Sequence, residues 1–438
     1  MSWIEATAFL LGGLFFLMFL GLPVAVAFLA VNILGVLVFM GGMSGIDQLI
    51  SNATDSITTF SLVPVPLFTL MGEILFHSGL AVRVFDALDL CFGRIRGRLS
   101  YLTVAGGTIF ATLSGSSMAN TAMLGSTLMP DMLKRGYKPH VIMGPIIATG
   151  AVAMIIPPSS LAVLLGSLAR IDVGGLLIAG LVPGLILICM YIVTIRIALA
   201  RDPEAAPAYQ VDRAPMGQIV KAVVLNVAPM GLVVFCVVGL ILLGWATPTE
   251  SAAFGTLSVT ILALLYRRLS LPVIIKALMG TLKVSGMMLF IIIGSTTFSQ
   301  LLAFSGASSG MINFATGFDL GFYAMLGSML LVLIVLGMFM DQLSIMMLPL
   351  PIFLPLVAIY QIDPIWFGVV MLLSLEMSLA TPPFGLLLFV MAGVAPKGTT
   401  MGQIARSALP YLLCTLVLIV AMVFVPGIAT WLPSVIGN

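Results

Sequence analysis

Proline recurs in this chain at a fixed spacing of 225 residues. Because proline fixes φ and lacks a backbone N–H, it marks places where a helix begins, bends or breaks. Two halves that interrupt their helices at the same places are expected to share one fold. The matched prolines are Pro23 with Pro248, Pro130 with Pro355, Pro139 with Pro364, Pro157 with Pro382, and Pro158 with Pro383.

The composition predicts a membrane protein built from helices. Hydrophobic residues make up 61% of the 438 residues and charged residues only 8%, whereas a soluble domain carries about 25% charged residues. Apolar runs such as Ile186–Cys189 are continuous, which favours helical spans over the alternating strands of a membrane barrel. An internal repeat in such a chain is typical of secondary transporters. The four cysteines are scattered and predict no disulfide framework.

Lysine and arginine are clustered along the chain. Residues 1–82 and 284–396 contain neither. Since cytoplasmic loops collect these residues, the clusters predict which segments face the cytoplasm, and only Arg170 lies outside them. The clusters occupy residues 83–98, 134–138, 196–221, 267–283 and 397–406.

This charge pattern predicts a threading in which the N-terminus lies outside. Residues 83–98 combine polar and apolar positions at helical spacing, so we expect a helix along the membrane surface there. Residues 201–217 form a polar cytoplasmic linker. The predicted complete spans are residues 6–20, 24–41, 60–77, 174–199, 222–245, 249–266, 284–304 and 402–425.

Two segments of each half do not fit simple spans. Residues 100–133 have positive charge at both ends and a small polar centre, which predicts a re-entrant hairpin on the cytoplasmic side. Residues 320–358 lack flanking cations and are expected to form a hairpin that opens to the outside. Residues 140–169 and 364–394 should cross in two pieces, broken at the double prolines.

The hairpins open to opposite sides in this threading, so the repeats are inverted. We predict an all-α polytopic membrane protein with an inverted-repeat, elevator-type transporter fold, two re-entrant hairpins and two broken helices. Residues 1–217 would form the first repeat and residues 218–438 the second.

The double prolines leave backbone carbonyls without donors. Pro157 and Pro158 cannot bond the carbonyls of Ala153 and Met154, four residues earlier. An unpaired carbonyl in hydrocarbon costs several kcal/mol unless something replaces the donor. One interpretation is that neighbouring serine and threonine hydroxyls replace it. The other, which two matched breaks favour, is that a sodium ion does, because helix C-terminal ends carry partial negative charge.

Candidate ligands gather at the hairpin centres and the breaks. The N-terminal ends of the half-helices after the breaks favour an anionic substrate. Ionisable groups inside spans are costly and usually functional, so we also expect a role for Glu376. The candidate sodium ligands are Ser114, Gly115, Asn120, Ala153, Met154, Asp341, Ser344, Ser378, Leu379 and Thr381. The candidate substrate ligands are Ser116, Ser117, Asn120, Ser159, Thr381 and Gly385.

The sequence offers little support for enzymatic chemistry. It contains no G-x-x-x-x-G-K-[ST] phosphate loop and no H-E-x-x-H zinc motif. An intramembrane enzyme would need a catalytic dyad, and none is found. We therefore predict that the chain is not an enzyme.

Five motifs resemble the large membrane subunit of tripartite ATP-independent periplasmic (TRAP) transporters, and they span nearly the whole chain. They are Ser114 to Ser126 with Met129 to Tyr137, Ile155 to Ser159, Ala246 to Glu250, Gly337 to Asp341 with Pro351 to Pro355, and Leu375 to Gly385. Phe384 after the second double proline is bulkier than this family leads one to expect.

The resemblance implies an elevator-type carrier in the inner membrane of a bacterium or archaeon, driven by a sodium gradient. It implies a small membrane subunit, here a separate protein, and a soluble extracytoplasmic substrate-binding protein. Substrates would be organic acids, and sodium would bind where hairpin tips meet broken helices. The alternative is a stand-alone exchanger, of sodium for protons or anions, on a related inverted-repeat fold that needs no soluble partner.

Overall fold

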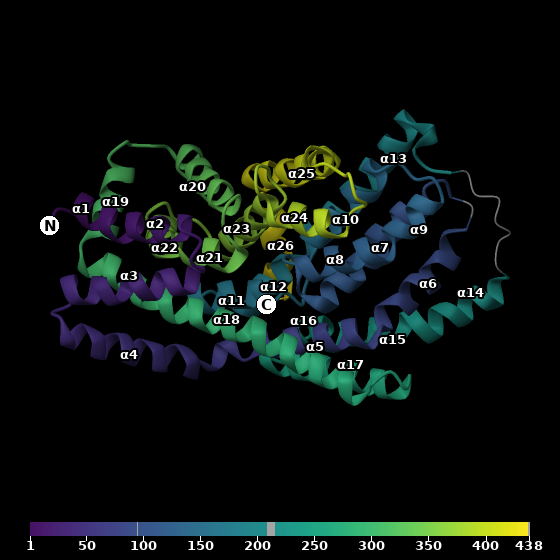
Figure 1. Ribbon diagram of the computed structural model, residues 1–438, viewed down its shortest axis with the longest axis horizontal. Coiled ribbons are helices and arrows are strands. Elements are labelled where there is room, and N and C mark those ends of the chain that lie inside the picture. Colours follow the sequence, from purple (N-terminus) through teal and green to yellow (C-terminus); the bar gives the residue numbers. More distant parts are fainter. Residues whose placement is uncertain (94, 208–214, 437–438) are drawn as a thin grey trace. The chain divides into compact units, whose positions relative to one another are not determined.

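The computed structural model describes residues 1–93, 95–207 and 215–436, and every regular element in these ranges is a helix (Figure 1). The described chain therefore agrees with the all-α prediction. Arg94 and Arg213, two members of the cation clusters, lie outside the described residues, as do residues 208–214 of the predicted linker at 201–217.

The chain divides into two compact units. Unit 1 comprises Met1–Ser61, Leu282–Leu333 and Met340–Pro364, and unit 2 comprises Leu62–Thr281, Ile334–Phe339 and Ile365–Asn438. Each unit takes segments from both halves of the sequence. A compact unit and a sequence repeat are different kinds of division, so the repeats at 1–217 and 218–438 remain a prediction.

Unit 1 is built from helices at the N-terminus and from helices between residues 282 and 364. A π-helical turn at Ala8–Gly12 joins the first two helices. The helices are α1 (Trp3–Thr7), α2 (Gly13–Phe19), α3 (Val24–Phe39), α4 (Met43–Thr58), most of α18 (Leu271–Phe304), α19 (Ala307–Thr316), the first part of α20 (Phe322–Gly337), α21 (Gln342–Met347) and α22 (Leu350–Ile359).

Polar side chains join α4 to α18 in unit 1. The Asn52 amide nitrogen donates to the Gln300 side-chain oxygen at 2.7 Å and to the Thr297 hydroxyl at 3.2 Å. One turn further along α4, the Ser56 hydroxyl donates to Thr296 at 3.3 Å. Residues four apart lie on one face of a helix, so α4 presents a polar stripe to α18.

Unit 2 holds both helix pairs that flank the double prolines. A nearly continuous helix covers Met216–Leu242. The helices of unit 2 are α5 (Pro64–Ser78), α6 (Leu80–Phe92), α7 (Arg98–Ser114), α8 (Ser117–Thr127), α9 (Met129–Lys134), α10 (His140–Val152), α11 (Ser160–Ala169), α12 (Val173–Ala179), α13 (Leu181–Arg201), α14 (Met216–Ala222), α15 (Ala228–Val234), α16 (Leu240–Leu242), α17 (Pro248–Leu265), the start of α18, α23 (Pro364–Leu379), α24 (Leu386–Val394), α25 (Met401–Phe424) and α26 (Gly427–Ile436).

Helix α10 lies at the centre of unit 2. It contacts α7, α8, α13 and α25, and from Val141 to Val152 every one of its residues is buried. At the N-terminal end of α10, Lys138 forms an ion pair with Asp202, with nitrogen–oxygen distances of 2.7 and 2.9 Å. The hydrogen bond from Lys138 lowers the pKa of the Asp202 carboxyl, so this carboxylate remains charged at neutral pH.

Within residues 1–93, 95–207 and 215–436, six helices are long and apolar enough to cross a membrane. They correspond to six of the predicted spans, and the predicted spans at 6–20 and 24–41 appear as shorter apolar helices. The largest boundary difference is at the helix expected over 284–304, which begins at Leu271, and the helix expected from residue 222 begins at Met216. Lys276 and Lys283 limited the apolar window used for the prediction, but lysine is a good helix former and does not end a helix.

Both predicted helix breaks are present. Helix α10 ends at Val152 and α11 begins at Ser160, while α23 ends at Leu379 and α24 begins at Leu386. The bond between the two prolines is cis in both breaks. The amphipathic segment predicted at 83–98 is helical over Leu80–Phe92, with Leu80, Val84 and Phe85 buried.

We expect Asn52→Ala to lower the stability of the protein, because it leaves the Gln300 and Thr297 partners unpaired in a buried seam. Losing such buried hydrogen bonds costs about 1–3 kcal/mol of unfolding free energy. The melting temperature in detergent measures the effect. Thr54→Ala, on the exposed face of the same helix, is the control, and equal melting temperatures for both variants would contradict the prediction.

Candidate functional site

The turn between α7 and α8 contacts the first helix break. Gly115 has a left-handed backbone conformation (φ +59°), and the Ser116 hydroxyl accepts a hydrogen bond from the Ala119 N–H to cap α8. The Ser160 hydroxyl, just after the double proline, donates to the Gly115 carbonyl at 3.3 Å. The small polar centre of the predicted first hairpin and the first broken helix therefore meet.

One face of α8 carries polar side chains into the interior of unit 2. Ser117, Asn120 and Thr121 have the spacing of one helix face, and each is at most 2% exposed. The Asn120 amide donates to the Thr149 carbonyl at 2.8 Å. Thr149 lies in the last turn of α10, where carbonyls lack intrahelical partners, so Asn120 satisfies one of them.

Glu376 of α23 is fully buried and lies against this face. The Ser117 hydroxyl donates to one carboxylate oxygen of Glu376 at 3.4 Å. The other carboxylate oxygen has no hydrogen-bond partner in the described chain. Glu376 was expected to be functional, and Ser117 was a candidate substrate ligand; the structure brings the two together.

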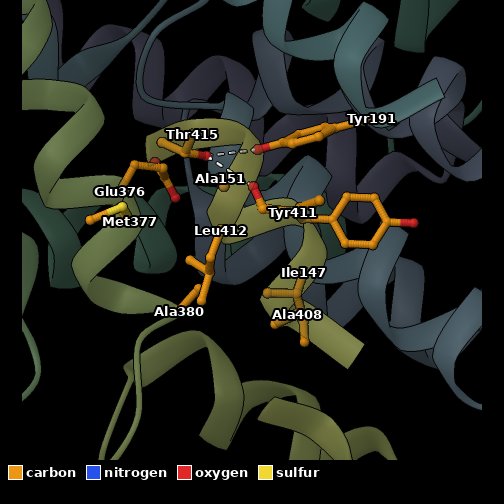
Figure 2. A pocket seen from close by; sticks show the side chains of 11 residues that line it. Ile147, Ala151, Tyr191, Glu376, Met377, Ala380, Ala408, Tyr411, Leu412 and Thr415 are labelled. Carbon is orange, nitrogen blue, oxygen red and sulfur yellow. Dashed lines mark hydrogen bonds between the residues drawn. The ribbon is translucent and has the colours of Figure 1, made fainter. Parts of the chain in front are cut away.

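A small cavity adjoins Glu376 (Figure 2). The Tyr191 hydroxyl of α13 and the Thr415 hydroxyl of α25 lie 3.3 Å apart on its wall, and the Tyr411 hydroxyl points away from Glu376. Apolar side chains of α10, including Ile147 and Ala151, complete the lining. The space suits roughly one water-sized guest beside a carboxylate.

Local donors already serve two of the four carbonyls predicted to be free. The Ser159 hydroxyl donates to the Met154 carbonyl at 2.5 Å, and the Thr381 N–H donates to the Ser378 carbonyl at 3.1 Å. The interpretation in which nearby groups replace the lost donors therefore holds for Met154 and Ser378. The Ala153 and Leu379 carbonyls accept no comparable bond within the described residues.

The two helices that follow the breaks begin differently. The Ser159 hydroxyl accepts a hydrogen bond from the Ala162 N–H at the start of α11. At the matching position before α24 stands Phe384, and Gly385 caps the helix without a side-chain hydrogen bond. The Phe384 ring is half exposed and contacts the Phe339 ring, with centroids 5.3 Å apart. The first N–H groups of α24 therefore remain available to another acceptor.

The candidate ligands of the predicted second hairpin belong to unit 1. Asp341 caps α21 by accepting hydrogen bonds from the Leu343 and Ser344 N–H groups, at 3.1 and 3.2 Å. Its other carboxylate oxygen accepts from the Ser344 hydroxyl at 2.5 Å. The structure thus brings Asp341 and Ser344 together, and it gives this carboxylate a structural role at the start of the helix.

The family model for the DctM component of tripartite ATP-independent periplasmic transporters matches residues 11–428. The chain belongs to the DctM family. This agrees with the resemblance seen in the sequence, and the family is one of transporter permeases rather than enzymes.

Two relatives are named for different substrates. The "C4-dicarboxylate TRAP transporter large permease protein DctM" of Pseudomonas aeruginosa is 32% identical over 381 residues, covering 86% of this chain and 87% of the relative. The "Ectoine/5-hydroxyectoine TRAP transporter large permease protein UehC" of Ruegeria pomeroyi is 28% identical and covers 95% and 96%.

Two solved structures share the fold of this DctM-family permease at low sequence identity. The Alcanivorax borkumensis YdaH transporter has a TM-score of 0.63 at 15% identity, covering 90% of this chain and 89% of that one. Neisseria gonorrhoeae MtrF has a TM-score of 0.57 at 14% identity, covering 86% and 84%.

Sequence reasoning missed several polar residues around the site. Thr149, Tyr191 and Thr415 lie within apolar helices, and no motif marks them. Their roles depend on which helices meet in unit 2, and the hydropathy pattern of each helix alone carries no such signal.

We expect Gly150→Ala to destabilise the permease. A β-carbon at Gly150 would stand 3.0 Å from the Ser117 carbonyl oxygen and closer still to the Thr121 hydroxyl, so α8 would have to move away from α10. Such overpacking costs about 1–3 kcal/mol, which a lower melting temperature would report. Gly393→Ala is the control, because nothing lies within 4 Å of that added atom; an equal loss in both variants would contradict the prediction.

Proposed function

We propose that this DctM-family permease imports a small organic acid across the cytoplasmic membrane of a bacterium or archaeon, driven by a sodium gradient. It works with a small membrane subunit and an extracytoplasmic substrate-binding protein. The match of the family model over residues 11–428 carries this proposal. The relatives named for C4-dicarboxylate and ectoine transport support a small polar metabolite as the substrate.

Sodium as the coupling ion, and therefore as cargo, is supported by the oxygen atoms near the breaks. Sodium binds oxygen ligands, and the Ala153 and Leu379 carbonyls retain free lone pairs at helix ends that carry partial negative charge. The hydrogen bond from the Ser160 hydroxyl to the Gly115 carbonyl supports a site where the predicted first hairpin centre meets the first break. Ser114, Gly115, Asn120 and Ala153 form the proposed first sodium site. Leu379 and Thr381 at the second break, and Asp341 and Ser344 at the second predicted hairpin, are further proposed sodium ligands, each described within its own unit, with Met154 and Ser378 as weaker candidates.

An anionic substrate is supported by the start of α24. Its first N–H groups lack a side-chain cap, and helix N-termini favour negative charge. Gly385 at this end and the Thr381 hydroxyl are the proposed contacts, with Ser116, Ser117, Asn120 and Ser159 on the side of the first break. Which acid is carried depends also on the binding protein.

An elevator mechanism with inverted repeats is supported by matched local geometry. Both breaks follow the same sequence spacing, and in each half a left-handed glycine, Gly79 or Gly306, joins a long helix to a shorter one. In the proposed cycle, the hairpins and broken helices move across the membrane while the remaining helices stay in place.

Uptake by proteoliposomes tests this function. We expect the permease with its small subunit and binding protein to accumulate a labelled organic acid only under an inward sodium gradient. Asn120→Ala and Asp341→Ala should reduce sodium-dependent uptake to the level of empty liposomes, because the first removes a buried and the second a half-buried oxygen group at a predicted hairpin. Unchanged uptake in both variants would remove those residues from the site.

The controls are Asn313→Ala and Asp47→Ala, which replace exposed residues of the same types and should leave uptake intact. Transport that proceeds without the binding protein would favour the stand-alone exchanger instead.

A further inference from the structure

We propose that α6, α14 and the C-terminal end of α17 together form a binding site for an anionic phospholipid at the membrane surface. Arg83, Lys221, Arg267 and Arg268 supply positive charge to the lipid phosphate, and apolar side chains beside them contact the acyl chains. All of these residues belong to unit 2. The site is separate from the helix breaks and requires only that the chain is a membrane permease, so it does not depend on the proposed coupling ion or substrate.

Three of the five cation clusters of the sequence meet at this place. Helix α6, which carries Arg83, packs against α14, which carries Lys221, and against the π-helical turn Val223–Val227 (Figure 1). The Tyr266 hydroxyl at the end of α17 donates to the Leu225 carbonyl in that turn, and two arginines follow Tyr266 directly. The charge pattern predicts that each of these clusters faces the cytoplasm, where anionic headgroups are within reach.

The Arg83 guanidinium is held in place by an aromatic ring. Its central carbon lies 4.8 Å from the centroid of the Tyr266 ring, which is the geometry of a cation–π contact. The hydrogen bond from Tyr266 to Leu225 fixes that ring in turn. Because the guanidinium is positioned before any ligand arrives, less conformational freedom is lost on binding. Its planar N–H groups match two oxygens of a phosphate.

The cations of the site have no acidic partners in the part of the chain that the structure describes. Neither Arg83 nor the exposed residues Lys221, Arg267 and Arg268 form an ion pair there, although Asp86 lies one turn from Arg83 on α6. Like charges gathered without counter-charges repel one another. A bound anion offsets this repulsion, and basic residues at a membrane surface attract anionic lipid.

The surroundings favour a lipid rather than a soluble anion. Val84, the residue after Arg83, lines a small cavity whose other walls are apolar side chains of α5, α6, α7 and α15. Acyl chains gain free energy by covering apolar surface, whereas a soluble anion leaves it uncovered. Four apolar side chains close to the cations in the sequence are between 49% and 71% exposed, namely Val224, Leu225, Leu264 and Leu265.

Lipid-dependent melting of the full-length permease in detergent tests the proposal. Melting temperatures are recorded with phosphatidylglycerol, with zwitterionic phosphatidylcholine of the same acyl chains, and with glycerol phosphate, which carries the anion without the chains. Native mass spectrometry counts the bound lipids. We expect only phosphatidylglycerol to raise the melting temperature, because a ligand that binds the folded state stabilises it.

Arg83→Gln removes the stacked charge, and Arg268→Gln removes an exposed one. We expect Arg83→Gln to weaken phosphatidylglycerol binding about 10-fold and Arg268→Gln about 5-fold. The second variant keeps the test decisive if the first fails to fold. Arg83→Lys should recover part of the affinity, because it restores the charge without the planar N–H groups. Arg406→Gln is the matched control, because Arg406 is an exposed arginine of α25 in the same unit, and it should bind lipid as the wild type does.

Equal stabilisation by phosphatidylcholine and phosphatidylglycerol would overturn the proposal, as would the same loss of lipid binding in Arg406→Gln as in Arg83→Gln. Stabilisation by glycerol phosphate alone would assign the cations to a soluble anion. If Arg83→Gln lost binding to the small membrane subunit while its phosphatidylglycerol binding stayed unchanged, the cations would belong to a protein interface. Both of these outcomes reject the lipid site.

Discussion

Backbone groups in apolar surroundings must find partners, and this requirement shapes the centre of unit 2. Each double proline stops a helix and leaves carbonyls that the helix would otherwise bond. Nearby groups replace some of the lost donors: the Ser159 hydroxyl donates a hydrogen bond to the Met154 carbonyl, and the Thr381 N–H donates one to the Ser378 carbonyl. The Ala153 and Leu379 carbonyls accept no such hydrogen bond within the described residues, so their oxygens remain available to another ligand. A continuous helix would offer none.

A side chain of the neighbouring helix α8 also satisfies a backbone carbonyl at the end of α10. Asn120 reaches the Thr149 carbonyl because Gly150, with no side chain, lets α8 approach the last turn of α10. The amide thus takes the place of a missing N–H at a helix end. A bulkier residue at 150 would separate the helices and leave both groups unpaired, so the polar site depends on a residue that contributes no polar atom.

The parts of the fold that follow from local chemistry were predictable, and those that depend on helix pairing were not. Proline positions located both breaks, because a missing N–H acts within one turn. Hydropathy located six long apolar helices within the described residues, because the apolar character of a span is also a local property of the sequence. Helix α4 was not predicted. Its buried residues Asn52 and Ser56 are polar, so the sequence shows no apolar face, and their hydrogen-bond partners lie on the distant helix α18. The composition of the two units was equally inaccessible, because each takes segments from distant parts of the sequence.

The centres of the two predicted hairpins resemble each other only in part. Ser116 and Asp341 stand 225 residues apart, and each caps the helix that follows it. Beyond the caps the likeness ends, because α8 continues with Asn120 and Thr121 where α21 has Ile345 and Met346. A cap satisfies backbone groups that any helix start exposes, so it persists in both halves. The polar face behind the cap is not required by helix geometry; in α8 it brings Ser117 against Glu376 and Asn120 against the Thr149 carbonyl.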